Sequence, residues 1–290
     1  MDIFVQIVIN TLVAAAGYAL ATMGFSLVYG VTRVLHLAHS IVVATAAFLF
    51  FAIVSRAGAP WYIGVPAATV GAVIVAVLMY LLVYRVLKRN KASGLVLLLA
   101  TLALLTLGTH VLLGFFGPRT LTVVAPYVNK SVEVFGGIVT TTQLILMRAA
   151  VACSAMLAFS LRFSGFGRKL RAVADNPEVA ATCGISVVRT ELIAMVVSAL
   201  TASVAGILIS LELALQANMS VMLSVKIFTV GIIGGVGSLV GALVGALVVA
   251  LAEQSASWFF GSGWQHAASF FLLFLFLLFR PRGLFGQKDV

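Results

Sequence analysis

The stretch GFGRKLRAVADNPEVAATCGI, residues 165–185, is a polar segment in an otherwise apolar sequence. Three basic and two acidic residues fall within positions 168–178, whereas the runs 139–161 and 187–211 on either side are mainly apolar. Apolar runs of this length, joined by short charged links, are typical of a chain that crosses a membrane several times. The segment is therefore expected to lie where the chain leaves the membrane.

This segment is predicted to form two short helices. Leu170, Val173 and Ala174 have the i, i+3, i+4 spacing of one helix face. The Asn-Pro pair at 176–177 ends this helix and starts the next, because Asn caps a helix and Pro suits its first position. Gly184 ends the second helix. Such a pair either lies on lipid headgroups or fits a groove of a partner protein, and its small alanines favour the groove.

The composition of the whole chain indicates a membrane protein. Its 290 residues are 62% hydrophobic and 9% charged, with a mean hydropathy of +1.19, whereas a soluble domain carries about 25% charged residues. At roughly 20 residues per crossing, the length fits about eight to ten transmembrane helices in a single all-α domain, residues 1–290. The net charge of +10 does not indicate nucleic-acid binding, since the basic residues lie between apolar runs.

The distribution of Lys and Arg predicts the orientation. The apolar runs are 4–30, 36–55, 61–84, 93–116, 139–161, 187–211, 222–236, 238–260 and 264–279. With the N-terminus outside and one crossing per run, the inner links hold Arg33, Arg85, Lys88, Arg89, Lys91, Arg162, Arg168, Lys169, Arg171, Arg189, Arg280, Arg282 and Lys288. The outer links hold Arg56, Arg119 and Lys130. This bias places the segment 165–185 and the C-terminus in the cytoplasm. The loop 117–137 is then external, with a small hairpin expected at 123–137.

Two segments are unusual for simple crossings. Residues 222–236 include Gly231, Gly234 and Gly235 and are short for a full crossing. Residues 17–40 also hold three glycines, before the polar TRVLHLAHS. Glycine-interrupted segments at matching places in two halves indicate a transporter built from inverted repeats.

The late glycines divide into two groups by predicted role. Gly241 and Gly245 belong to a four-residue repeat of small residues, which lets helix backbones approach closely in lipid. Gly234, Gly235 and Gly237 fall at a break, where free backbone amides and a helix N-terminus can face an anionic group. The first group is interpreted as packing and the second as part of a translocation pathway.

A few polar side chains lie within or beside the apolar runs. His36 and His39 are expected to be satisfied polar residues at a helix start, with a position lining a pathway as the alternative. Glu253 is a functional candidate because ionisable groups inside a membrane are costly. Glu212 and Lys226 flank a predicted external turn and are interpreted as snorkelling toward water.

Four stretches carry a family resemblance. They are GYALATMGFSLVYGVTRVLHLAHS (17–40), GRKLRAVADNPEVAATCGI (167–185), KIFTVGIIGGVGSLVGALVGALVVALAE (226–253) and RPRGLFG (280–286). Together they resemble, in the right order and over essentially the whole chain, the motifs of LivH-type permeases, the membrane subunits of branched-chain amino acid ABC importers. That family usually has Asn and then Ala-His-Gly where this chain has His36 and then Ala38-His39-Ser40, a departure that bears on the substrate.

The resemblance implies a permease subunit in the bacterial inner membrane, surrounded by lipid. A related second permease would complete the pathway, two cytoplasmic ATPases would carry ATP and Mg, and an extracytoplasmic binding protein would deliver a small solute. That solute would be a branched-chain amino acid or a related amide or carboxylate. The residues assigned to the ATPase-coupling surface are Gly167, Arg168, Arg171, Asp175, Glu178 and Gly184. The residues expected along the pathway are His36, His39, Ser40, Gly234, Gly235, Gly237 and Glu253.

Two other classes stay open from the residues alone. An ion-coupled secondary transporter shares repeats and broken helices but needs a coupling-ion site, for which Glu253 is a poor lone candidate. A structural membrane protein would use the glycines for packing only. The sequence has no G-x-x-x-x-G-K-[ST] loop, so ATP is not expected on this chain, and no H-E-x-x-H, G-x-S-x-G or carboxylate pair that favours an enzyme. Cys153 and Cys183 predict neither a disulfide nor a metal site, and no cofactor is expected.

Overall fold

The computed structural model describes residues 3–123, 131–134, 136–280 and 283–285. The long helices are α1 (Ile3–Thr32), α2 (His39–Phe51), α3 (Trp61–Met79), α5 (Gly94–Phe116), α6 (Thr141–Phe163), α9 (Val187–Glu212), α10 (Met219–Gly234), α11 (Leu239–Phe260) and α12 (Gln265–Phe279). The short ones are α4 (Arg85–Arg89), α7 (Gly165–Asp175), α8 (Pro177–Thr182) and the 3-10 turn η3 (Ser262–Trp264). The π-helical segments η1 (Ala52–Arg56) and η2 (Tyr80–Tyr84) continue α2 and α3, and two strands, β1 (Ser131–Val134) and β2 (Gly137–Thr140), precede α6.

Eight helical stretches among the described residues are long and apolar enough to cross a membrane. The helix α10 has 16 residues and is shorter. The predicted runs therefore correspond to eight spans and one short helix, and the expected shortness of 222–236 is confirmed. The all-α, multi-pass fold of about eight to ten helices is also confirmed. The inverted-repeat relation between the halves stays a prediction.

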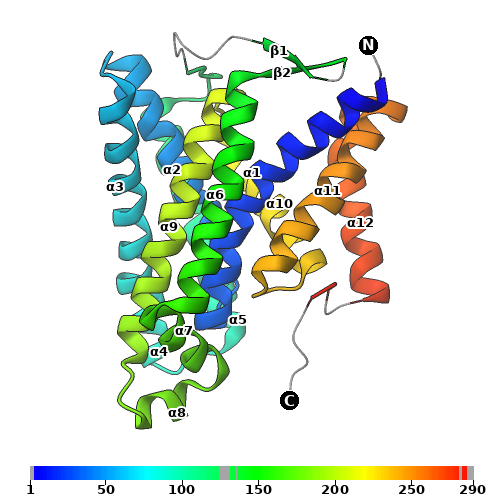
Figure 1. The fold of residues 1–290 in the computed structure, drawn as a ribbon. Coiled ribbons are helices and arrows are strands. Elements are labelled where there is room, and N and C mark those ends of the chain that lie inside the picture. The colour runs from blue at the N-terminus through cyan, green and yellow to red at the C-terminus, as the bar shows by residue number, and fades with distance from the viewer. Residues whose placement is uncertain (1–2, 124–130, 135, 281–282, 286–290) are drawn as a thin grey trace.

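The central helix of the bundle is α1. It crosses the molecule diagonally in Figure 1 and packs along α9, α11, α6 and α10. Helices α5, α6 and α12 lie at the outside and expose many apolar side chains, such as Phe270, Phe271 and Phe274 of α12. Apolar side chains exposed in this number would promote aggregation in water, whereas they suit contact with lipid tails.

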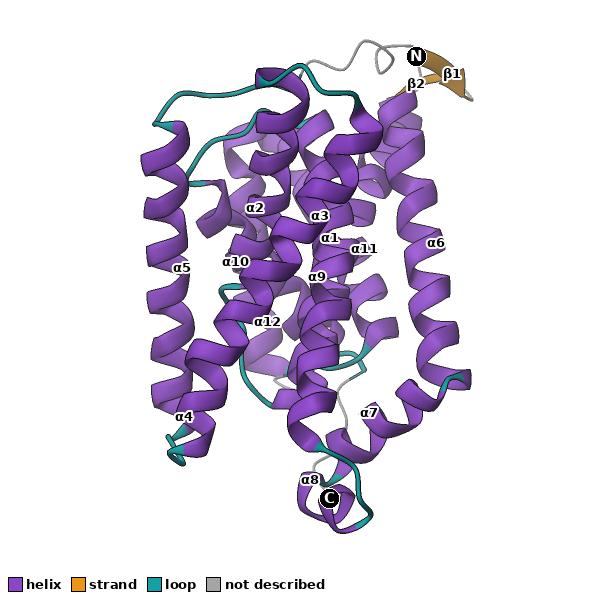
Figure 2. Cartoon of the chain, turned by 90° about the vertical axis from the view of Figure 1, so that its left-hand side faces the viewer, coloured by secondary structure: helices purple, strands orange, loops and turns teal. Residues whose placement is uncertain are grey.

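The two ends of the bundle differ. The start of α1 and the β1–β2 hairpin lie at one end, which we call the hairpin end, and α4, α7 and α8 lie at the other (Figures 1 and 2). This arrangement agrees with the alternation of links predicted from the sequence. Residues 124–130 and 135 of the loop 117–137, and residues 281–282 and 286–290 of the tail, lie outside the described residues.

The hairpin lies further along the chain than predicted. Its strands pair antiparallel with Ser131 opposite Thr140, so 137–140 is a strand although the apolar run was marked from 139. The reason is a capping box at the start of α6. The Thr140 side chain accepts from the Gln143 amide at 3.2 Å, and the Gln143 side chain accepts from the Thr140 amide at 3.0 Å.

The α10–α11 contact is made backbone to backbone. A Cβ atom on Gly245 would overlap the carbonyl oxygen of Val230, and one on Gly241 would overlap that of Gly234. Gly234 in turn lies against the Gly241 carbonyl. The packing role predicted for Gly241 and Gly245 is thus confirmed, and Gly234 shares it.

Candidate functional site

The helix pair α7–α8 projects from the end of the bundle opposite the hairpin (Figure 2). Leu170 and Val173 of α7 are buried in an apolar cluster with Met23 and Leu27 of α1 and Leu157 of α6. The predicted amphipathic face is therefore real, and it packs on the bundle itself. This contact fixes the pair to the central helix.

The turn between the two helices has the predicted cap. Asn176 Oδ1 accepts hydrogen bonds from the amides of Glu178 at 3.0 Å and Val179 at 3.1 Å. Pro177 is the first residue of α8, and Gly184, with φ +80°, follows its end. The sequence 176–184 thus sets both the bend and the length of the second helix.

The residues assigned to coupling differ in exposure. Arg168, Arg171, Asp175, Glu178 and Gly184 are exposed. Gly167 is buried against the Leu161 carbonyl of α6, and a Cβ atom added there would overlap this carbonyl. That same carbonyl accepts a hydrogen bond from the Arg171 guanidinium. Gly167 therefore allows α7 to fold back on α6, whereas the charged residues form the outer surface of the pair.

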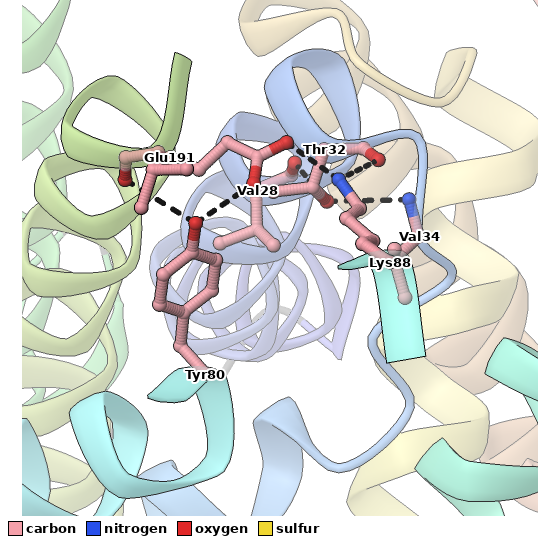
Figure 3. A network of polar contacts seen from close by, with 7 residues as sticks. Val28, Thr32, Val34, Tyr80, Lys88 and Glu191 are labelled. Carbon is pink, nitrogen blue, oxygen red and sulfur yellow. Dashed lines mark hydrogen bonds and ion pairs between the residues drawn. The ribbon is translucent and has the colours of Figure 1, made fainter. Parts of the chain in front are cut away.

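A polar network joins the helices beside this pair (Figure 3). Lys88 Nζ lies 2.5 Å from Glu191 Oε1 and donates to the Thr32 carbonyl at 2.8 Å. Tyr80 donates to Glu191 Oε2 at 2.8 Å and to the Val188 carbonyl at 3.2 Å. The network connects the end of α1, the η2–α4 segment and the first turns of α9.

A second link runs directly to α7. The guanidinium of Arg33, which follows α1, donates to the Ala174 carbonyl at 2.9 Å. Helix α7 also packs against the first part of α9. It therefore contacts both α1 and α9.

His36, His39 and Ser40 lie buried at the link between α1 and α2. His36 Nδ1 is 2.6 Å from the Tyr84 hydroxyl. His39 Nε2 is 3.0 Å from the Ala21 carbonyl, and its Nδ1 is 3.3 Å from the Ser198 hydroxyl. Ser40 donates to the Leu37 carbonyl at 3.2 Å. His39 matches the expected satisfied residue at a helix start, whereas His36 Nε2 is buried without a hydrogen-bond partner among the described residues. The pathway role of His36, His39 and Ser40 stays a prediction.

The glycine break between α10 and α11 is closed by backbone contacts. The Gly235 amide donates to the carbonyl of Gly231 at 2.9 Å, so the expectation of a free amide at this position is wrong. The amides of Leu284 and Phe285 donate to the Ile233 and Gly234 carbonyls at 2.8 and 2.9 Å. The tail thereby caps the end of α10.

Gly237 has φ +90° and lies against Gly30 and Tyr29 of α1. The two glycine-interrupted segments predicted from the sequence, 17–40 and 222–236, also meet, because Gly231 lies against Phe25 of α1. An L side chain at position 237 would be strained by the backbone conformation alone. A pathway role for Gly235 and Gly237 stays a prediction.

Glu253 is buried within a second polar cluster. Its side chain is 1% exposed, its Oε2 is 3.0 Å from Lys226 Nζ and 2.6 Å from the Tyr18 hydroxyl, and Oε1 accepts from Ser269. Lys226 also lies 2.5 Å from the Tyr18 hydroxyl. The interpretation of Lys226 as a snorkelling residue is wrong, because a buried carboxylate holds its ammonium group. The cluster joins α1, α10, α11 and α12.

A cavity of about 680 Å³ adjoins this cluster at the hairpin end of the bundle. Its lining includes Tyr18, Lys226, Glu212 and the amides Asn10, Gln143, Gln216, Asn218, Gln254 and Gln265, with apolar residues of α1, α9 and α10 between them. Glu212 accepts from Gln143 Nε2 at 2.7 Å. A mixed polar and apolar lining of this size suits a small ligand.

Comparison with known sequences identifies the family. Residues 7–279 match the model of the branched-chain amino acid transport system permease component family. The chain belongs to this family of permeases. The multi-pass fold and the end-to-end motif resemblance are thereby explained together.

Relatives of the permease extend over nearly its full length. The high-affinity branched-chain amino acid transport system permease protein LivH of Salmonella typhimurium is 27% identical and is aligned over 99% of this chain and 97% of its own. BraD of Pseudomonas aeruginosa is 25% identical with the same coverage. A probable LivH of Methanocaldococcus jannaschii is 27% identical, over 92% of this chain and 88% of its own.

A solved structure supports the fold of the permease. PsaBC from Streptococcus pneumoniae, in complex with a Fab, superposes with a TM-score of 0.53 and covers 96% of this chain and 93% of its own. Its sequence identity of 12% restricts the likeness to the arrangement of helices.

Sequence reasoning missed the polar links of the permease. No local pattern pairs Glu191 with Lys88, which is predicted only as one of the cationic residues of a cytoplasmic link. Tyr18 and Ser269 carried no signal, because isolated hydroxyls are common in membrane helices. The available clue was that acidic residues within the runs are few, so each is expected to have a cationic partner.

Proposed function

We propose that the permease is the membrane-spanning subunit of a bacterial ABC importer. It would translocate a small solute, a branched-chain amino acid or a related amide or carboxylate, delivered by an extracytoplasmic binding protein. ATP hydrolysis on two partner ATPase chains, which carry ATP and Mg, would drive the transport. The permease itself contributes a pathway and a mechanical link.

The observation that carries this proposal is the α7–α8 pair. Its apolar face packs on the bundle, while its charged residues are exposed, and the pair lies at an end of the molecule (Figure 2). Val179, on α8, is 56% exposed among those charges. A short, capped helix with a charged rim and an exposed apolar centre suits a groove on another protein.

The proposed coupling runs through contacts described above. When the ATPases close, α8 moves as a rigid unit with α7, whose contacts with Arg33 and with α9 pass the displacement to α1 and α9. Both helices line the cavity at the opposite end of the bundle. The permease can therefore link an event at the α8 end to an opening at the hairpin end.

The orientation and the assembly are part of the proposal. The excess of Lys and Arg in links at the α8 end supports a cytoplasmic position for α7–α8 and for the C-terminus, with the N-terminus outside. The exposed apolar faces of α5, α6 and α12 supply surface for lipid and for a second, related permease subunit. No observation favours the ion-coupled alternative, because Lys226 already pairs with the candidate acid Glu253.

The proposal is tested by reconstituting the full permease with its candidate ATPases, second permease and binding protein in liposomes. Solute uptake that requires ATP inside and the loaded binding protein outside is expected. Uptake driven by a proton or sodium gradient without ATP would contradict the proposal.

A further inference from the structure

We propose that the cavity at the hairpin end is the solute site of the permease and that Lys226 binds the solute's carboxylate there. This inference rests on the proposed function and narrows it. Of the solute classes left open, it selects a small amino acid over a neutral amide. No local sequence pattern predicts Lys226 at such a site.

The first argument is the number of donors on Lys226. An ammonium group has three N–H donors, and two are directed to Tyr18 at 2.5 Å and Glu253 at 3.0 Å. The Lys226 side chain is 15% exposed and lines the cavity, whereas Glu253 is 1% exposed and lies behind it. The third donor is thus available to a ligand in the cavity.

The second argument is that Lys226 is held in place. Tyr18 donates to the same Glu253 oxygen that Lys226 contacts, and Ser269 donates to the other carboxylate oxygen. Glu253 therefore orients the ammonium group of Lys226, as a positioning residue. A cation fixed in a region of low dielectric binds a carboxylate more strongly than a mobile surface lysine does.

The third argument is the remainder of the lining. Glu212 places a carboxylate on the same cavity as Lys226, so both charges of an amino-acid zwitterion have a partner of opposite sign. Apolar residues, including Val13, Ile209 and Met222, supply surface for an aliphatic side chain. A urea or a simple amide has no carboxylate to accept the third N–H of Lys226.

Polar groups continue inward from this site. Thr22 and Ser26 follow Tyr18 at intervals of four residues on α1, and Thr229 follows Lys226 by three residues on α10. Their three hydroxyls are buried without a hydrogen-bond partner among the described residues. Buried, unpaired hydroxyls are costly, and a solute that passes between α1 and α10 would use them.

The test is solute protection of a cysteine in the cavity. In full-length permease with Cys153→Ala and Cys183→Ser, Met222→Cys provides the single thiol, and right-side-out membrane vesicles are treated with sulfonatoethyl methanethiosulfonate. We expect labelling of this cysteine, slower labelling with leucine present, and no protection by leucinamide. Labelling that fails, or equal protection by leucinamide, would overturn the proposal.

The role of Lys226 is separated from its ion pair by a double variant. Lys226→Met with Glu253→Gln removes both charges and so avoids an unpaired buried carboxylate. We expect this variant to keep its gel-filtration profile while leucine protection weakens about 10- to 100-fold, the loss for one charged hydrogen bond. Lys226→Arg should retain most of the protection. Unchanged protection in the double variant would show that Lys226 is structural only.

This readout is independent of ATP-driven transport. If the permease failed to work with ATPases, leucine protection would still report the cavity. If transport were confirmed and protection absent, the importer would stand and the solute site would be rejected.

Discussion

Lys88 and Glu191 lie 103 positions apart in the chain, yet their charged groups are 2.5 Å apart. The Glu191 side chain is 7% exposed and also accepts from Tyr80. The pair joins α4 to the start of α9, directly after the projecting α8. It holds the first turns of α9, the helix that follows α8 in the chain, to α4 and to the end of α1.

Glu191→Gln is expected to lower the free energy of unfolding by about 1.5–3 kcal/mol, because it removes the carboxylate that pairs with Lys88 and weakens the bond from Tyr80. Thermal unfolding in detergent measures the change. Glu212→Gln, on the same helix but exposed, is the matched control and should cost under about 0.5 kcal/mol. Equal effects of the two variants would contradict the structural role of the pair.

Asp175→Asn is expected to weaken binding of the ATPase by about 1–2 kcal/mol, a factor of about 5 to 30, because it removes a charge from the exposed coupling surface. Titration of the ATPase onto solubilised permease measures this affinity, and membrane insertion should be unchanged. Glu133→Gln makes the same chemical change at the hairpin end, where Glu133 is also exposed, and should have no effect. If Glu133→Gln lost affinity and Asp175→Asn did not, the ATPase would bind at the hairpin end, and the assignment of the coupling surface would be contradicted.

Asn176→Ala is expected to destabilise α8 by about 0.5–2 kcal/mol, because the Asn176 side chain caps the amides of Glu178 and Val179. Hydrogen exchange at these amides should accelerate while that of α9 stays unchanged. Asn176→Asp retains an acceptor and should restore protection. Faster exchange spread evenly over α9 would mean that the cap has no local role.

Gly245→Ala is expected to destabilise the permease by about 1–3 kcal/mol, because the added Cβ would overlap the Val230 carbonyl. Gly114 is also inside a helix but has open space around the position of a Cβ. Gly114→Ala should therefore be neutral or stabilising by up to about 1 kcal/mol. The two variants are compared by thermal unfolding in detergent, and similar midpoints would rule out backbone contact at Gly245.

Features that depend on neighbouring residues in the chain could be predicted from the sequence. The apolar runs correspond to the helices, the shortness of α10 was visible in its length, and Asn176 and Gly184 set the ends of α8. Each follows from local spacing or from a residue with a strong conformational preference. The hairpin lies later in the chain than predicted, because the capping box of Thr140 and Gln143 sets the start of α6 directly after the second strand.

Features that depend on distant residues could not be predicted. Tyr18 and Glu253 are 235 positions apart, and nothing in either run indicates the other. Lys226 is predicted to snorkel toward water, because no local pattern shows that its partner, Glu253, lies beside it on the next helix. Gly234 was assigned to the pathway, and its contact with Gly241 became visible only from the packing of α10 on α11.

The central claim, that α7–α8 meets an ATPase, is tested most directly by cross-linking from Cys183. This thiol is exposed at the end of α8, and Cys153→Ala makes it the single cysteine of the chain. A maleimide-benzophenone on Cys183 in the assembled complex should cross-link to the ATPase, with a yield that changes when ATP is added. The same probe on Ser131→Cys, with both native cysteines replaced, should not. A complex that co-purifies intact but cross-links to the ATPase from position 131 and not from Cys183 would contradict the account.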